Sequence, residues 1–308
     1  MSLTVCKLRY HQGMPLTTLL PVFLVAAIGA LLVKLPWLRT QWHAGVTELA
    51  AKFLLPVLLL VGAYRTGMPA SMSWQVLCAF YLPLGLLFAG VRLLARRDAA
   101  ATALAATYSN TVFVGLPVLV QALGPGSLQF ALPVIAFHSL FCFTLYHLSD
   151  EHAGAGWMAP LLNTLRNPIV AALLLGLALN LAAIRLPQAV LASLDILAAA
   201  ASPCALLSLG GSVALLKPGR WLPTCAVAAS KLLLFPLAVM VLAVFVFQLP
   251  AAAACVLVVL ASCPVGVNAA FVVAPKGDGA RLVNSAILVS SLACAVTIPG
   301  WLWLLRQA

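Results

Sequence analysis

"YSNTVFVGLPVLVQALG", residues 108–124, lies deep in a hydrophobic run, where a membrane-spanning helix would be expected. The stretch nevertheless places three hydrogen-bonding side chains and two helix-breaking residues within nine positions: Ser109, Asn110, Thr111, Gly115 and Pro117. Lipid offers no partner to free backbone N–H and C=O groups. An interruption of a membrane helix therefore survives only where it is buried in protein or lines a wet cavity. The stretch predicts a membrane helix that is broken at its centre.

The composition of the whole chain is that of a membrane protein. Of its 308 residues, 64% are apolar and only 7% are charged, whereas soluble domains are about 45–50% apolar and about 25% charged. Apolar runs long enough to cross a hydrocarbon core of about 30 Å recur along the sequence. The alternating short segments of a β-barrel are absent. We therefore expect an all-α polytopic membrane protein.

The net charge of +11 does not indicate a nucleic-acid partner. Lys and Arg lie in short segments between apolar runs, which is the pattern of cytoplasmic loops, and no basic cluster with interleaved aromatic residues occurs. The chain has six acidic residues, too few to build a carboxylate-rich metal centre readily, and we expect no metal site. The eight cysteines include no C-x-x-C pair and indicate small packing residues.

Polar residues divide the chain into ten apolar spans. Their approximate bounds are 15–35, 44–64, 74–94, 100–123, 127–148, 167–184, 188–216, 221–247, 251–274 and 281–304. Residues 1–14 are expected to form an N-terminal tail, and 149–166, the longest connection, is expected to be a cytoplasmic loop. This division leaves five spans in residues 15–148 and five in residues 167–305.

The distribution of basic residues predicts the orientation. If the N-terminus is external, eleven of the 17 Lys and Arg fall in cytoplasmic loops and Lys231 lies within a span. The five in external segments are Lys7, Arg9, Arg65, Arg185 and Arg306. Because cytoplasmic loops carry the excess of positive charge, we expect both termini outside.

The two halves of the chain resemble each other weakly at matching positions. The second span of each half carries a proline at its middle, Pro56 and Pro203, and the fourth carries "YSNTVFVGLP" or "ASCPVGVNAA" (261–270). Five spans is an odd number, so the second half must enter the membrane from the opposite face. An inverted repeat with interrupted helices at corresponding positions is typical of secondary transporters.

Two interrupted helices that cross at the midplane would form a binding site for an anion. Each half-helix N-terminus carries about half a positive charge and free N–H groups. Proline breaks the helix, glycine lets the backbone turn and a ligand approach, and the polar side chains offer donors. The candidate substrate-binding residues of the two spans are Asn110, Thr111, Gly115, Pro117, Cys263, Pro264, Gly266 and Asn268.

These motifs resemble the auxin efflux carrier family of membrane transporters. "SNTVFVGLPVL" (109–119) and "CPVGVNAAFVVA" (263–274) carry the resemblance, which extends from Pro15 to Leu305. It implies two inverted five-helix repeats whose fourth and ninth helices cross. It also implies an elevator mechanism and a homodimer formed through helices 1, 2, 6 and 7. The short central loop resembles bacterial members assigned to malate or malonate, not the plant auxin exporters.

Three further polar residues lie within apolar spans. His138 in the fifth span is interpreted as a packing residue, as a polar wall of the substrate site or as a proton-responsive group, and we include it among the candidate substrate-binding residues. Lys231 in the eighth span and Asp195 in the seventh each need a partner or a wet path, because a charge at a helix centre costs at least about 2.5–3.5 kcal/mol. Lys231, Pro56 and Pro203 are assigned gating or structural roles.

The sequence therefore predicts a secondary transporter that moves a small organic anion across a bacterial inner membrane by alternating access. Malate, malonate and an auxin-like acid are the candidate carboxylates. The alternative is a sodium- or proton-coupled organic anion symporter of the bile-acid-carrier type. An enzyme is not expected, because no catalytic motif such as H-E-x-x-H or G-x-S-x-G occurs. No cofactor is expected, and a proton is retained as a candidate coupling ion.

Overall fold

A computed structural model describes residues 15–36, 38, 41–66, 74–95, 97–149, 168–215, 221–273 and 278–307. The expected N-terminal tail 1–14 and residues 150–166 of the expected cytoplasmic loop lie outside the described residues. The described chain is helical, and its β structure is a single isolated bridge between Ser109 and Val265.

The helices of the first half begin and end close to the expected spans. They are α1 (Pro15–Leu32), α2 (Gln41–Leu49), η1 (Ala50–Leu54), α3 (Leu55–Thr66), α4 (Trp74–Leu94), α5 (Ala99–Thr107), η2 (Thr111–Gly115), α6 (Leu116–Leu123), η3 (Pro125–Ser127) and α7 (Leu128–Ser149). The elements α2, η1 and α3 follow one another without a break and form one long helix, whereas the chain between α5 and η2 is not helical.

The helices of the second half follow the same order. They are α9 (Pro168–Leu181), α10 (Gln188–Leu215), α11 (Trp221–Ala229), η4 (Ser230–Leu234), α12 (Phe235–Val241), η5 (Leu242–Val246), α13 (Ala251–Ser262), α14 (Ala269–Val272) and α15 (Asp278–Gln307). Here α11 to η5 form one long helix, and the chain between α13 and α14 is not helical.

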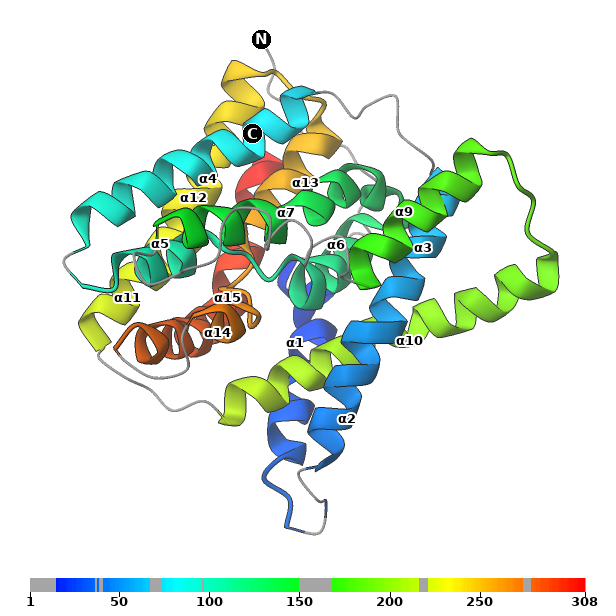
Figure 1. The fold of residues 1–308 in the computed structure, drawn as a ribbon, viewed down its shortest axis with the longest axis horizontal. Coiled ribbons are helices and arrows are strands. Elements are labelled where there is room, and N and C mark those ends of the chain that lie inside the picture. Colours follow the sequence, from blue (N-terminus) through cyan, green and yellow to red (C-terminus); the bar gives the residue numbers. More distant parts are fainter. Residues whose placement is uncertain are drawn as a thin grey trace.

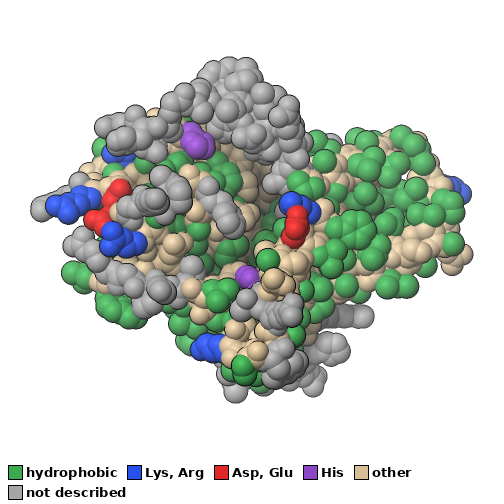
Figure 2. Space-filling view, turned by 60° about the horizontal axis from the view of Figure 1, so that its bottom comes forward, with side chains coloured by type: hydrophobic (Ala, Val, Ile, Leu, Met, Phe, Trp, Pro, Cys, Tyr) green, Lys and Arg blue, Asp and Glu red, His purple; other side chains and the backbone are tan. Residues whose placement is uncertain are grey.

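Within the described residues, six helices are long and apolar enough to cross a membrane: Gln41–Arg65, Trp74–Leu94, Pro125–Ser149, Gln188–Leu215, Trp221–Val246 and Asp278–Leu305. Hydrophobic side chains cover much of the described surface in Figure 2, and charged side chains are sparse there. These features show a polytopic helical membrane protein. The count of ten spans and the inverted repeat stay predictions.

The helices form two groups in space (Figure 1). We call α1, α2–α3, α9 and α10 the glycine-packed bundle, because α1 packs on α10 and α9 packs on α3 through glycines. A methyl group at Gly29 or Gly210 would clash with backbone oxygens across the α1–α10 contact, and one at Gly176 would clash with Leu60 O of α3. Backbones that approach this closely hold helices together in a membrane.

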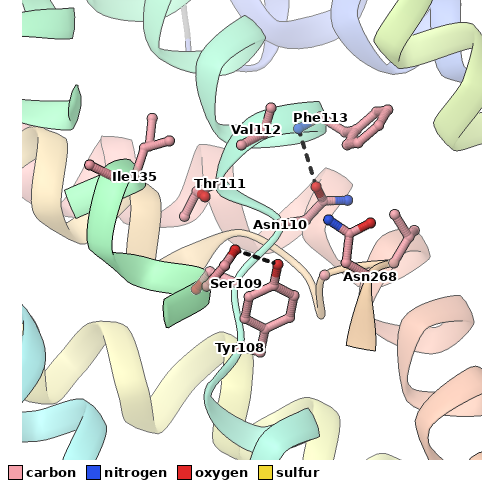
Figure 3. A pocket seen from close by; sticks show the side chains of 12 residues that line it. Tyr108, Ser109, Asn110, Thr111, Val112, Phe113, Ile135 and Asn268 are labelled. Atoms are coloured by element: carbon pink, nitrogen blue, oxygen red, sulfur yellow. Dashed lines mark hydrogen bonds between the residues drawn. The ribbon is translucent and has the colours of Figure 1, made fainter. Parts of the chain in front are cut away.

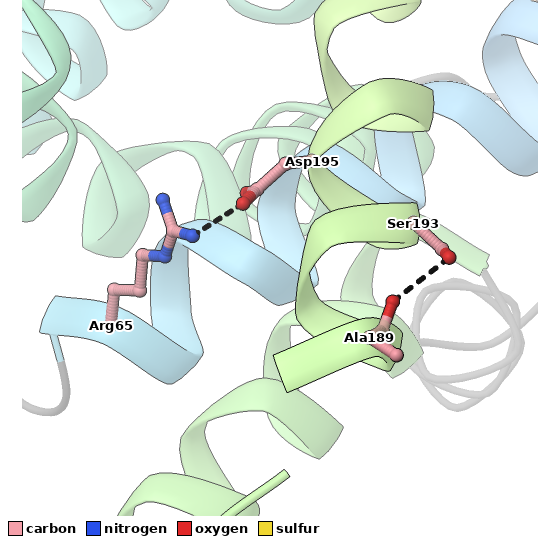
Figure 4. A network of polar contacts seen from close by, with 4 residues as sticks. All are labelled: Arg65, Ala189, Ser193 and Asp195. Carbon is pink, nitrogen blue, oxygen red and sulfur yellow. Dashed lines mark hydrogen bonds and ion pairs between the residues drawn. The ribbon is translucent and has the colours of Figure 1, made fainter. Parts of the chain in front are cut away.

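Polar contacts join the glycine-packed bundle at both of its ends. At one end, the Arg65 guanidinium of α3 is 2.6 Å from the Asp195 carboxylate of α10 (Figure 4), and Tyr64 Oη donates to Ile184 O at 3.1 Å. At the other end, His43 Nε2 lies 3.0 Å from Ser208 O of α10. The intramembrane charge of Asp195 is therefore paired with Arg65.

The remaining helices, α4 to α7 and α11 to α15, form the second group, which we call the pocket bundle. Its buried core includes Phe80, Leu104, Leu116, Phe235 and Leu257, each 0% exposed. Its members are joined to one another by hydrogen bonds between helices, such as Tyr81 Oη to Val134 O at 2.7 Å. Both interrupted helices belong to this bundle.

The described helices contain four π-turns, and three of them, η1, η2 and η4, end two residues before a proline. The amide of the residue before the proline donates to the carbonyl five positions back: Leu55 to Ala50, Leu116 to Thr111 and Phe235 to Ser230. Proline has no N–H and its ring presses on the carbonyl four positions back. A wider turn relieves that contact and keeps the helix continuous.

The position of the first helix break therefore differs from the expected one. The chain leaves the helix at Tyr108–Asn110, whereas Gly115 and Pro117 lie in the continuous helix Thr111–Leu123. Pro117 is absorbed by the π-turn, and Gly115 is helical with φ −59°. The proline does not mark the break because the π-turn accommodates it.

Candidate functional site

The two non-helical segments, Tyr108–Asn110 and Cys263–Asn268, lie side by side and pair as a short antiparallel ladder. Asn110 N donates to Pro264 O at 2.8 Å, and Gly266 N donates to Tyr108 O at 3.0 Å. These bonds flank the bridge between Ser109 and Val265. Each segment thus satisfies two backbone groups of the other, which lipid could not do.

Gly266 is required for this close pairing. A methyl group at Gly266 would clash with the Tyr108 ring and would lie 3.3 Å from Ser109 O. Gly115 has a similar role one turn further on, because a methyl group there would meet the Leu260 side chain at 2.9 Å and Cys263 Sγ at 3.3 Å. Both glycines allow the two interrupted helices to approach each other.

A side chain from a neighbouring helix holds each non-helical segment. Ser109 N donates to His138 Nε2 of α7 at 2.8 Å, and Val265 N donates to Ser290 Oγ of α15 at 3.0 Å. His138 is 1% exposed, and its ring stacks on that of Tyr108 with centroids 5.1 Å apart. The His138 side chain therefore supports the segment both by packing and by one specific hydrogen bond. Of the roles considered from the sequence, this is closest to the packing role.

Lys231 is fully buried and lies against the C-terminal end of α13. Its ammonium donates to Ala261 O at 2.5 Å and to Cys263 O at 2.7 Å, and it lies 5.0 Å from the centroid of the Phe235 ring. The end of a helix presents free carbonyls and partial negative charge, so the ammonium caps this half-helix. Neither an ion pair with Asp195 nor a side chain that reaches the membrane surface is formed.

A cavity lies between the two segments and α7, with an empty volume of about 450 Å³ that includes its mouth. Figure 3 shows the side chains that line it. They are Tyr108, Ser109, Asn110, Thr111, Val112, Phe113, Ile135, Ala136, Ser139, Gly266, Val267 and Asn268. The lining combines hydroxyl and amide groups with an apolar wall.

Asn110 presents a free hydrogen-bond donor at this cavity. Its Oδ1 accepts from Phe113 N at 3.2 Å and so caps the helix Thr111–Leu123, but its Nδ2 has no hydrogen-bond partner among the described residues, although Asn110 is only 4% exposed. Ser109 Oγ is likewise without a partner within the described part of the chain. Unpartnered buried polar atoms are uncommon, and both residues line the same cavity.

The structure brings four of the candidate substrate-binding residues to the cavity: Asn110, Thr111, Gly266 and Asn268. The other five lie around it without lining it. Gly115 and Pro117 are in the helix that follows the first segment. His138 accepts from the Ser109 amide, and Pro264 O accepts from the Asn110 amide. Cys263 Sγ donates to Val259 O at 3.3 Å. Pro203 lies inside the continuous helix α10, and Pro56 follows the π-turn η1.

Sequence reasoning missed Tyr108, Ser139 and Ser290 as site residues. Tyr108 Oη and Ser139 Oγ are 3.0 Å apart at the cavity wall, and Ser290 holds the second segment. Tyr108 and Ser109 open the quoted stretch and could have been named from it. Ser139 directly follows His138, whereas nothing in the sequence around Ser290 separates it from Ser291 beside it.

A family model described as membrane transport protein matches residues 158–302. No curated protein matches the sequence significantly. The family is one of transporters and not of enzymes, in agreement with the interrupted helices and the buried polar cavity. Residues 158–302 are thus similar to a family of membrane transport proteins, in agreement with the resemblance of the chain's motifs to the auxin efflux carrier family.

Proposed function

We propose that this protein is a secondary transporter that carries a small organic anion, a carboxylate such as malate, malonate or an auxin-like acid. The substrate binds in the cavity between the segments Tyr108–Asn110 and Cys263–Asn268. The observation that carries this proposal is the Asn110 amide, which is buried at the cavity and has an unpartnered Nδ2 among the described residues.

The electrostatics of the cavity favour an anion. The helix Thr111–Leu123 begins at the cavity, and the N-terminus of a helix attracts negative charge. The Asn110 Nδ2 group, the Asn268 amide and the Ser109 hydroxyl add donors. None of the twelve lining residues is acidic, so a carboxylate would meet donors without a competing negative charge.

The arrangement of the two bundles supports alternating access by an elevator-type motion. Glycine-mediated backbone contacts and the Arg65–Asp195 pair hold α1, α2–α3, α9 and α10 together. The pocket bundle has its own internal hydrogen bonds, such as those of His138 and Lys231. Between the bundles, the α3–α7 contact at Gly62 involves the side chains of Leu128 and Leu132, which is the kind of surface that can slide.

We further propose that the glycine-packed bundle forms a homodimer in a bacterial inner membrane, with both termini external. Exposed apolar side chains recur on one stripe of α1, at Leu20, Leu24, Ile28 and Leu31. Their spacing of three and four residues places them on one helix face, which would meet lipid or a second copy of the chain.

The experiment that tests the function has two steps. Purified protein is first screened by thermal unfolding against malate, malonate and indole-3-acetate, because a ligand of the folded state raises the midpoint once its concentration exceeds Kd. Uptake of any ligand into proteoliposomes is then measured with no gradient, with a sodium gradient and with a pH gradient. Uptake that needs sodium or a proton gradient would select the coupled symporter, and the absence of carboxylate binding and uptake would reject the proposal.

A further inference from the structure

The pairing of the two non-helical segments leaves one backbone N–H of each without a partner in the ladder. Asn110 and Gly266 use their amides within the ladder. Ser109 and Val265 are the residues directly opposite each other, so their own N–H groups point away from the partner segment, as in any antiparallel pair of this kind. Both residues are buried, at 1% and 0% exposed, and a buried N–H without an acceptor costs about 1–3 kcal/mol.

The acceptors of these two N–H groups occupy corresponding places in the two halves. His138 is on α7, the long helix after the first interrupted helix. Ser290 is on α15, the long helix after the second. Both acceptor side chains are buried, with residue exposures of 1% and 0%. Each long helix therefore fixes the position of the segment before it through one side chain.

We propose that His138 and Ser290 are the positioning residues of the cavity, and that the cavity keeps its shape only while His138 Nε2 carries no proton. Neither residue lines the cavity, so neither is assigned a contact with the substrate. His138 instead fixes Ser109, whose neighbours Tyr108 and Asn110 line the cavity. Because it concerns the regulation of the proposed anion site, the inference rests on the proposed function for its physiological meaning.

The chemistry of imidazole gives this arrangement a sensitivity to protons. To accept from Ser109 N, Nε2 must be the unprotonated nitrogen, so the neutral ring carries its proton on Nδ1, which lies 3.9 Å from Cys142 Sγ. A proton on Nε2 would turn the acceptor into a donor that faces another N–H group. The Ser109 contact would then be lost.

The surroundings of His138 oppose a positive charge on the ring. The ionisable groups around it are Cys142 on its own helix, Tyr108 stacked on its face, and Lys231 on the helix that begins at Trp221. From α4 it meets the Phe80 ring edge to face, with centroids 5.6 Å apart. None of these groups is an anion at neutral pH, and the Lys231 ammonium would repel an imidazolium. A proton that reaches the ring therefore favours displacement of the segment.

Hydrogen–deuterium exchange tests the inference without any ligand. Exchange is followed in peptides that cover residues 108–115 and 263–270 of the purified full chain, for the wild type, His138→Gln and His138→Leu. Gln keeps an acceptor oxygen and cannot titrate, whereas Leu has no acceptor. At pH 7.5 we expect His138→Leu to exchange residues 108–115 on the order of tenfold faster than the wild type, as loss of one buried hydrogen bond predicts, and His138→Gln to stay within about threefold.

The pH arm separates positioning from simple packing. After correction for the intrinsic exchange rate, the wild type should lose protection of residues 108–115 between pH 7.5 and pH 5, and His138→Gln should not. Ser290→Ala serves as the matched control: it should loosen residues 263–270 to the same extent at both pH values, and Ser290→Thr should restore them. Peptides from α10 report global unfolding and should stay unchanged.

Two results would overturn the inference. One is unchanged protection of residues 108–115 in a folded His138→Leu protein, and the other is an identical pH response in the wild type and His138→Gln. Binding of malonate is measured in parallel at both pH values. If the exchange results are as expected but no carboxylate binds to the wild type, the proposed function fails while the positioning role of His138 stands.

Discussion

At the scale of single residues, the glycines of the site matter mainly because they leave room for side chains of the other interrupted helix, and not because they adopt a special backbone angle. Gly115 is helical, and Gly266 lies where a methyl group would clash with the Tyr108 ring. From sequence, both glycines predict loosened backbone at which a ligand could approach. The structure shows instead that the approaching group is the other interrupted helix. Sequence identifies the glycines but not their neighbours, which come from a segment about 150 residues away.

Replacement of Gly266 by alanine tests this reading. Gly266→Ala should destabilise the protein by about 1–3 kcal/mol, because the added methyl group must displace Tyr108 from a tightly packed site. The measurement is the free energy of unfolding in detergent. Gly90→Ala is the matched control: apart from its chain neighbours and the backbone of its own helix, no atom lies within 4 Å of the added methyl group, and alanine is favoured over glycine within a helix. Equal stability of the two variants would contradict the close pairing of the two segments.

Asn110 carries the sharpest test of the anion site. Asn110→Asp keeps the size and the Oδ1 acceptor of the Phe113 amide but replaces the free Nδ2 donor by a negative charge. Loss of one hydrogen bond to a charged group costs about 1.5–3 kcal/mol. We therefore expect carboxylate affinity to fall roughly ten- to hundred-fold, with charge repulsion adding to the loss. Transport is measured together with the unfolding midpoint, and near-native affinity in a folded Asn110→Asp protein would remove Asn110 from the substrate site.

At the scale of elements, the interrupted helices were predictable in kind but not in position. Sequence locates the first break near Gly115 and Pro117, whereas the chain leaves the helix at Tyr108–Asn110. The difference arises because the sequence shows that a proline removes one hydrogen-bond donor, but does not show whether the preceding turn can adapt. Here the π-turn Thr111–Gly115 accommodates Pro117. The second break needed no such correction, because Pro264 lies within the non-helical segment itself.

Lys231 shows how one element completes another. Its ammonium donates to Ala261 O and Cys263 O and so caps the C-terminal end of α13, the half-helix that leads into the second segment. Lys231→Ala should lower the stability by about 2–5 kcal/mol, since the change leaves a cavity and removes the partner of two carbonyls. The readout is the unfolding midpoint and the yield of folded protein.

Lys231→Met separates the two causes. Methionine fills most of the volume and restores no hydrogen bond, so Lys231→Met should recover part of the stability but not the protection of residues 263–270 from hydrogen exchange. A Lys231→Ala protein with native stability and a specific loss of substrate binding would place Lys231 in the binding site and not in the framework.

At the scale of the whole molecule, composition is sufficient to establish a helical membrane protein, and the ends of the apolar runs locate most helices to within a few residues. The division into two bundles is not visible in the runs themselves. It depends on which helices carry glycines at their contacts and on pairs such as Arg65 with Asp195, far apart in the chain. The cavity was predicted only in part, since its Asn110 and Asn268 were named and its Tyr108 and Ser139 were not.

Contacts between helix ends also bear on the orientation of the chain. The Arg65–Asp195 pair and the Trp74–Phe247 ring contact each join ends that the expected topology places on the external side. The bond between Arg92 and Ser149 O joins two ends that it places on the cytoplasmic side. Each contact joins ends assigned to the same side, which supports the alternation of the spans.

Labelling of single cysteines tests that orientation. Arg185 and Arg97 are both exposed, and the expected topology places them on opposite sides of the membrane. In a Cys6→Ala, Cys225→Ala background, which removes the cysteine of the expected external tail and the exposed thiol among the described cysteines, Arg185→Cys should react with a membrane-impermeant maleimide in intact spheroplasts. Arg97→Cys should react only after permeabilisation.

A fusion of alkaline phosphatase at Ala308 should be active, because an even number of spans returns the chain to its starting side and the Lys and Arg bias places that side outside. The opposite pattern at all three sites would reverse the orientation. Labelling of Arg185→Cys and Arg97→Cys from the same side would instead contradict the odd number of spans between these two positions, and with it the inverted repeat.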